Sequence, residues 1–338
     1  MENFNKLFFH PSFNDTIEEL SRLNVQLPPN PSYQEMDFHL NTYPQNGKLI
    51  SKIEDIKSYS LSPKKGEKLA RSNITLCAYD ESINKFSGLE GAAFLTSHSL
   101  IVHHKNDYLP LNLLTFYFYT RAESFSKNSP LIKYSQDPET DSKKDYVNDR
   151  HKFIVDNTPN NSILFVDGPL IGGEISSYTL KLNNELLKKN VVPLFFVKNS
   201  NSNLVTDNIE ELTGNYNSDM HWAYRSLKTG ERTNLFKYVD QFNERNAKIF
   251  CYLKAFNVSP QRVEIHSSTF EKHSNQLPDL LDLVYYLLLV QGDLKNPQIR
   301  SISIAEKYAR ATLNLIDIDK LMKSSGIIPT MNQERFGW

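Results

Sequence analysis

The chain has 338 residues, of which 38 are lysine or arginine and 39 are aspartate or glutamate. This balance excludes a global charge that would draw the protein onto nucleic acid or a membrane surface, so any site for a polyanion must be local. The longest apolar run, residues 280–290, contains Asp282 and is too short to span a bilayer. Two cysteines, Cys77 and Cys251, each lie in an apolar segment, which favours core thiols in a reducing cytoplasm over a disulfide framework or a metal pair.

Residues 1–70 are polar and are expected to form an N-terminal extension suited to contacts with a partner or with a second copy of the chain. Within it, residues 16–23 (TIEELSRL) and 47–59 (GKLISKIEDIKSY) have the apolar spacing of short amphipathic helices. The proline-rich stretch NVQLPPNPSYQ lies between them. Residues 71–338 are expected to form the main domain.

Two predicted strands of the main domain each end on an aspartate. Residues 74–79 (ITLCAY) predict a strand that ends on Asp80, and residues 163–166 (ILFV) predict a buried strand that ends on Asp167. Asp167 is followed by Gly-Pro, so the second strand runs straight into a turn sequence.

The segments around these strands alternate between strand and helix patterns, which predicts an α/β fold. The strand, helix and strand over residues 163–200 imply a right-handed crossover and a parallel pair. One or two strands are expected over residues 88–105, single strands over residues 113–124, 191–200, 247–256 and 261–267, and helices over residues 144–155, 175–190, 277–293 and 301–323.

An aspartate at a strand end has two interpretations. Asp-Gly and Gly-Pro are ordinary turn sequences, so Asp167 taken alone favours a turn. If the strands before Asp80 and Asp167 lie side by side, however, the two carboxylates come close together and repel unless a cation lies between them. Mg²⁺ and Mn²⁺ prefer such oxygen ligands, and a pair of these ions activates water for phosphodiester hydrolysis. The histidines show no zinc-binding spacing, and no GxSxG motif or glycine-rich phosphate loop occurs.

Six segments of the chain, taken in order, resemble those of the NurA nucleases, and the resemblance covers residues 73–313. The segments are CAYDES, ILFVDGPLIGG, PLFFVKNS, RTNLFKY, FCYLKAFNVSPQRVEIHSS and VQGDLKNPQIRSISIAEKYARAT. The resemblance implies an RNase H-like mixed sheet flanked by helices, with an N-terminal helical extension and C-terminal helices. It also implies a DNA-end-processing nuclease that needs Mn²⁺ or Mg²⁺, forms a homodimer around a DNA channel and works with a HerA-type hexameric ATPase.

The resemblance also assigns catalytic and metal-binding residues. Asp80 matches the acid of the family's first strand, and Asp167 matches the later Asp-Gly acid. The family has a glutamate in the helix before the second of these strands, where this chain offers Asp145 and Asp149, and Asp149 is favoured as a further metal ligand. Glu306 takes the position of an acid or histidine in the C-terminal helix and is a further catalytic candidate.

The weaker candidates have structural alternatives. Glu81 replaces the glycine that usually follows the first aspartate, either as an extra ligand or as a solvated neighbour. Asp149 lies in a charged helix, where a carboxylate commonly faces water. Glu306 has the spacing to pair with Arg310 on one helix face.

Lys198 and Arg262 are the predicted contacts to DNA phosphates. Lys198 directly follows a strand and could instead stabilise its end. Arg262 and Glu264 are two residues apart in a predicted strand, so they share a face and could pair with each other.

The sequence therefore predicts a cytoplasmic, metal-dependent deoxyribonuclease that acts in DNA end processing or anti-phage defence. One alternative is a NurA-like structural subunit that keeps the DNA channel without metal competence, which the missing helix glutamate favours. A third interpretation is an RNase H-like enzyme that acts on RNA or an RNA–DNA hybrid.

Overall fold

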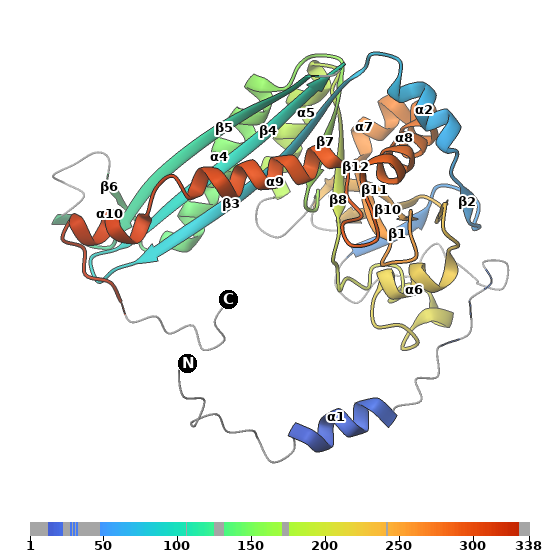
Figure 1. Ribbon diagram of the computed structural model, residues 1–338, viewed down its shortest axis with the longest axis horizontal. Coiled ribbons are helices and arrows are strands. Elements are labelled where there is room, and N and C mark those ends of the chain that lie inside the picture. Colours follow the sequence, from blue (N-terminus) through green and yellow to red (C-terminus); the bar gives the residue numbers. More distant parts are fainter. Residues whose placement is uncertain are drawn as a thin grey trace, which may run out of the picture.

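The computed structural model describes residues 13–22, 28, 30, 32, 48–105, 107–124, 132–170, 176–240 and 243–330. These residues form one mixed sheet flanked by helices (Figure 1). In spatial order the strands are β1 (Lys48–Lys52), β10 (Phe236–Asp240), β11 (Asn243–Lys254), β12 (Gln261–His266), β8 (Val192–Val197), β7 (Ser162–Asp167), β3 (Thr75–Ser87), β4 (Ala92–His104), β5 (Asp107–Thr120) and β6 (Ile132–Tyr134). Beside them, β2 (Tyr59–Ser60) pairs with β9 (Glu231–Arg232), which also pairs with β11.

Helices cover both faces of this sheet. They are α2 (Pro63–Ala70), α4 (Pro138–Asn157), α5 (Ser176–Lys188), α6 (Asp219–Ser226), α7 (Ser267–His273), α8 (Leu277–Gln291), α9 (Arg300–Leu313) and α10 (Ile318–Ser324). A further helix, α1 (Phe13–Arg22), lies apart from the sheet (Figure 1). None of the helices in the described part of the chain has the length and apolar character needed to cross a membrane.

The centre of the sheet confirms the RNase H-like fold expected from the sequence. β3, β7 and β8 run parallel to one another, β4 runs antiparallel to β3, and β5 runs antiparallel to β4. The crossovers between the parallel strands carry α4 and α5, as parallel pairing requires. On the other side, β8 pairs with β12, which forms an antiparallel hairpin with β11. These two strands correspond to the strands predicted over residues 261–267 and 247–256.

The two faces of the central strands bury different cores because side chains alternate along a strand. Leu76 and Ala78 of β3 pack into the core beneath α8 and α9. Cys77 and Tyr79 of the same strand pack into the opposite core, which α4 and α5 cover. Figure 1 shows α9 crossing in front of β3 and β4, with α4 behind them. The position of a residue along β3 therefore decides which core or site it faces.

The predicted helix over residues 47–59 is wrong, because this segment forms β1 and β2. Ile50 of β1 lies opposite Tyr238 of β10 and is buried in a cluster of aromatic side chains. Strand pairing with a distant segment thus outweighs the weak local helix pattern. The helix predicted over residues 16–23 is confirmed as α1.

Residues 63–70 join the fold through a close contact between helices. α2 packs on α8, and at Gly66 an added Cβ atom would lie 2.1 Å from the carbonyl oxygen of Asp282. The side chain of Asp282 accepts the backbone N–H of Ser62 at 2.7 Å, just before α2 begins. Glycine is therefore required at this crossing, and it fixes α2 against the C-terminal helices.

Candidate metal centre

Strand alternation places three charged side chains on the α9 face. Asp80 follows Ala78 by two residues in β3, and Asp167 follows Phe165 by two residues in β7. Lys198 follows Phe196 of β8 in the same way. Because all three strands are parallel neighbours, these side chains emerge close together at one end of the parallel ladder.

The sequence predicted that the first strand ends on Asp80, but β3 continues to Ser87. The parallel ladder between β3 and β7 does end here, with Tyr79 opposite Val166 as its last pair. Beyond this point β3 continues only as a hairpin arm paired with β4. Asp80 therefore lies at the end of the parallel ladder, although it is not at the end of its own strand.

The turn after Asp167 has the geometry that the Asp-Gly sequence indicates. Gly168 has φ +107°, a conformation that favours glycine, and its N–H donates to the carbonyl oxygen of Phe196 at 2.8 Å. Asp167 thus begins a turn and also presents its carboxylate to the α9 face, so the two interpretations of this residue are compatible.

Helix α9 supplies the third carboxylate. Its buried small residues Ala305 and Ala309 let it lie closely on β3 and β4, and Glu306 faces the strand ends. One oxygen each from Asp80, Asp167 and Glu306 lies within 4.8 Å of the other two. This is the one group of three or more potential metal ligands that the described residues form.

The carboxyl group of Asp80 carries the clearest electrostatic sign of this crowding. Burial raises its pKa, the N–H of Glu81 lowers it, and the negative charges of Asp167 and Glu306 raise it again, to about 7. Asp80 is therefore held in a place that disfavours its charged form unless a cation is added. Three oxygen ligands at this spacing suit a hard divalent ion such as Mg²⁺ or Mn²⁺.

Lys198 and Arg310 partly neutralise the group. Lys198 Nζ lies 2.5 Å from Asp167 Oδ2 and 3.9 Å from Glu306 Oε2. Arg310 lies 2.7 Å from the other oxygen of Glu306, so the predicted ion pair along α9 is present. Glu306 makes this pair and also belongs to the acidic group, and neither role excludes the other.

The structure does not bring Asp149 or Asp145 to this group. Asp149 accepts the Tyr117 hydroxyl at 2.7 Å, and Asp145 accepts the Tyr119 hydroxyl and lies 2.6 Å from Lys133 Nζ. Both acids belong to α4, which packs on the face opposite α9. The prediction that Asp149 completes the metal site therefore lacks geometric support, and Glu306 is the third carboxylate instead.

Glu81 is neither an extra ligand nor a solvated neighbour. It points to the α4 face, where it accepts the Tyr79 hydroxyl and lies 3.4 Å from Arg150 and 3.7 Å from His98. Burial alone would raise its pKa, but Arg150 and the hydrogen bonds from His98, Tyr146 and Tyr79 lower it to about 2. Sequence reasoning missed Arg150. The signal that could have found it is Glu81 itself, because a glutamate at a position where the family usually has glycine needs a partner of opposite charge.

Arg262 is buried and paired within the protein, in contrast to its predicted contact with a DNA phosphate. It is 4% exposed, and its Nε lies 2.7 Å from Glu264, so the alternative pairing along the strand is confirmed. Lys248 also binds Glu264, at 2.6 Å, and sequence reasoning missed it. A guanidinium enclosed in this way is not available to a phosphate.

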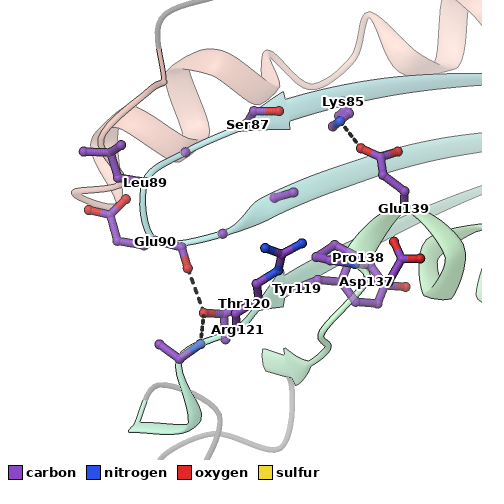
Figure 2. A pocket seen from close by; sticks show the side chains of 14 residues that line it. Lys85, Ser87, Leu89, Glu90, Tyr119, Thr120, Arg121, Asp137, Pro138 and Glu139 are labelled. Atoms are coloured by element: carbon purple, nitrogen blue, oxygen red, sulfur yellow. Dashed lines mark hydrogen bonds and ion pairs between the residues drawn. The ribbon is translucent and has the colours of Figure 1, made fainter.

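Two of the cavities lined by described residues lie outside the acidic group. One, of about 700 Å³, lies at the tip of the hairpin of β3 and β4, where Figure 2 shows Lys85 paired with Glu139. Lys85 is five residues beyond Asp80, or roughly 16 Å along the strand. The other, of about 460 Å³, begins directly after Lys198 and has a polar lining: Asn199, Ser200, Asn201, Ser218, Met220, His221, Tyr224, Asn257, Val258 and Ser259.

Comparison with known proteins gives one family match and several structural matches. Residues 153–324 match the family model described as the NurA domain, a range that includes Asp167, Lys198 and Glu306 but not Asp80. The chain is similar to the crystal structure of the NurA nuclease from Sulfolobus solfataricus, with a TM-score of 0.44 and 12% identity over 80% of this chain and 88% of that one.

A second similar structure is endonuclease V of Ciona intestinalis in complex with a 24mer DNA containing an inosine followed by a ribo-adenosine. Its TM-score is 0.37 and its identity 11%, over 76% of this chain and 96% of that one. No curated protein sequence matches the chain.

Proposed function

Because the chain belongs to the NurA family of nucleases, we propose that it is a Mn²⁺- or Mg²⁺-dependent deoxyribonuclease that hydrolyses phosphodiester bonds. The observation that carries the proposal is the group of Asp80, Asp167 and Glu306, whose oxygens lie within 4.8 Å of one another. A family relationship alone would leave the activity open, since catalysis depends on the residues of the site.

The three carboxylates would hold the metal. A divalent ion in such a site supplies a nucleophilic water at neutral pH and stabilises negative charge on the reacting phosphate. Asp80 would lose its proton on binding, because its carboxyl group has a pKa of about 7 and a ligand must be deprotonated. Glu306 would fix the site between the sheet and α9.

Lys198 would neutralise a DNA phosphate beside the metal. Its ammonium group now contacts Asp167 and lies near Glu306, at the edge of the acidic group. A divalent ion shared by these carboxylates would compete for the same oxygens, which would leave the lysine to bind a phosphate. The polar cavity that begins at Asn199 would then receive a nucleotide of the bound strand, with Tyr224 offering an aromatic ring.

We also propose the partners that the family suggests. The protein would act on DNA ends or single strands as a homodimer docked on a HerA-type hexameric ATPase, in DNA end processing or anti-phage defence. The extension expected over residues 1–70 would make these contacts through the part that precedes β1, since β1, β2 and α2 pack into the nuclease domain. Both cysteines are free and buried, which suits a cytoplasmic location.

The rival proposal is a catalytically inactive subunit that forms a DNA channel. The position of the two acids on α4 favours this rival, because Asp145 and Asp149 both accept hydrogen bonds from tyrosines of β5 instead of joining the acidic group. The acidic group therefore has three carboxylates rather than four. This rival predicts DNA binding without cleavage.

One experiment separates these proposals. The purified protein is incubated with linear double-stranded and single-stranded DNA, in Mn²⁺, Mg²⁺ or EDTA, with and without a HerA-type ATPase. We expect cleavage by the wild-type protein with metal, no cleavage with EDTA, and strongly reduced cleavage by Asp80→Asn and by Asp167→Asn. No cleavage by the wild-type protein in any mixture would favour the inactive subunit, and preferential cleavage of a competing RNA–DNA hybrid would change the substrate class.

A further inference from the structure

We infer that Lys248, Arg262 and Glu264 form a positioning network that fixes Asp167 and Lys198 from the opposite face of the sheet. The inference rests on the proposed function, since it concerns the same site. None of the three residues is placed to touch a metal or substrate. Their role would be to hold the two loops that carry the metal-site residues.

Glu264 is the centre of this network. It lies in β12 between Val263 and Ile265, which pack into the core beneath α8, so its side chain points to the other face. The carboxylate is fully buried, and its Oε1 accepts from Lys248 Nζ at 2.6 Å and from Arg262 Nε at 2.7 Å. Buried charges of this kind often add little net stability, because desolvation offsets their attraction. Their other contacts therefore indicate what they do.

The second oxygen of Glu264 holds the loop after Asp167. It accepts the backbone N–H of Leu170 at 2.8 Å. The same loop is fixed at its start by the hydrogen bond from Gly168 to the Phe196 carbonyl. The backbone that carries Asp167 is thus held on both sides of the turn, by the sheet ladder before it and by a buried carboxylate after it.

Arg262 holds the loop after Lys198. Its backbone lies opposite Val197 of β8, and its guanidinium Nη1 donates to Ser202 Oγ at 2.5 Å and to Ser200 Oγ at 3.3 Å. One connected network therefore reaches both loops. The side chains at the starts of these loops, Asp167 and Lys198, meet on the α9 face.

The chain offers a matched control elsewhere in the sheet. Glu54 accepts hydrogen bonds from Nη1 and Nη2 of Arg232, at 2.7 and 2.9 Å, and from the backbone N–H of Leu235 at 2.9 Å. This is the same chemistry, a carboxylate that binds a buried cation and a backbone N–H. It fixes β9 and the segment before β10 rather than the loops of the metal site.

The test uses three variants of the full chain. The apolar triple variant Lys248→Met/Arg262→Met/Glu264→Leu removes the network without leaving an unpaired buried charge, which favours folding. Arg262→Met removes the contacts to Ser200 and Ser202 and one of the two cations that bind Glu264, and it keeps Lys248 bonded to Glu264. Glu54→Gln is the control. Mn²⁺ affinity is measured by calorimetry, thermal unfolding by circular dichroism, and loop protection by hydrogen exchange without metal.

We expect the triple variant to fold, to bind Mn²⁺ roughly 10–100-fold more weakly, and to lose protection in the peptides that cover residues 168–170 and 198–202. Arg262→Met should lose protection only in residues 198–202, and Glu54→Gln should keep wild-type affinity. The inferred positioning role would be wrong if loop protection were unchanged in the triple variant. It would also be wrong if Glu54→Gln lost as much Mn²⁺ affinity as the triple variant. Wild-type protein that binds no Mn²⁺ would instead contradict the proposed function, and loop protection would still decide on the network.

Discussion

Asp80 and Glu81 are neighbours in β3, yet their carboxyl groups have opposite surroundings. On the α9 face, Asp80 meets two further acids, and its pKa is raised to about 7 by burial and their charges. On the α4 face, Glu81 meets Arg150, and its pKa is lowered to about 2 although burial opposes this. One face of the strand thus gathers acids with too few cations, while the other pairs its acid fully. The first arrangement is typical of a functional site and the second of a structural one.

The largest expected effect concerns the acids of the α9 face. Asp80→Asn and Asp167→Asn each remove a charged ligand, and we expect DNA cleavage to fall by on the order of 100-fold or more with the fold retained. Cleavage assays in Mn²⁺ measure the loss, and circular dichroism checks the fold. Glu81→Gln serves as the neighbouring control, assayed at a temperature where it stays folded. Loss of cleavage only in Glu81→Gln would reverse the assignment of the two faces.

Glu81→Gln should instead reduce stability. Without the Glu81 charge, Arg150 is left in a site where only 18% of its side chain is exposed, and removing one partner of a buried pair costs about 3 kcal/mol or more. Urea unfolding of the metal-free protein measures the difference. The double variant Glu81→Gln/Arg150→Met should recover part of the loss, because the unpaired charge is then gone. A Glu81→Gln protein as stable as the wild type would show that this pair is not important to the fold.

The same comparison predicts opposite pH dependences in the metal-free protein. Asp80 has a raised pKa in the fold, so its contribution to stability falls as pH rises from about 4 to about 7. Glu81 has a lowered pKa, so its contribution is complete above about 4.5 and is lost as pH falls towards 2. Relative to wild type, Asp80→Asn should therefore become more stable between pH 4 and 7, and the deficit of Glu81→Gln should shrink below pH 4.5.

Thermal unfolding of the three proteins across pH 3–8 measures these trends. Added Mn²⁺ should reverse the Asp80 trend, because the ion binds the deprotonated carboxylate and stabilises the wild type above pH 7. A stability difference between wild type and Asp80→Asn that does not vary with pH would contradict the raised pKa.

Local sequence patterns predicted much of the fold and two of the three acids, and the family resemblance named the third, Glu306, as a catalytic candidate. Strand alternation and the parallel crossover follow from apolar spacing, and these bring Asp80 and Asp167 to one edge. The identity of the third acid depends on which helix packs on the same face of the sheet as Asp80. That arrangement is set by long-range packing and not by local spacing. Asp149 and Glu306 both lie in charged helices, but only α9 packs on the face of Asp80.

The errors at Arg262 and in residues 47–59 have a related cause. An arginine side chain is chemically suited to bind a phosphate, so the sequence favoured that role for Arg262. In the structure, β12 is buried between β11 and β8, and Arg262 binds Glu264 and two serine hydroxyls instead. The segment of β1 has a weak helical pattern that pairing with β10 outweighs. In both cases the deciding partner lies far away in the sequence, where local spacing gives no information.

The smallest expected effect tests whether α4 contributes to the site at all. Asp149→Asn keeps a hydrogen-bond acceptor for the Tyr117 hydroxyl, so we expect a stability loss of about 1 kcal/mol or less and cleavage within about twofold of wild type. Glu306→Gln is the matched change on α9 and should weaken Mn²⁺ binding clearly. If Asp149→Asn lost cleavage and Glu306→Gln kept it, the metal site would draw on the α4 face. The two faces of β3 would then share the catalytic role that we propose for the α9 face.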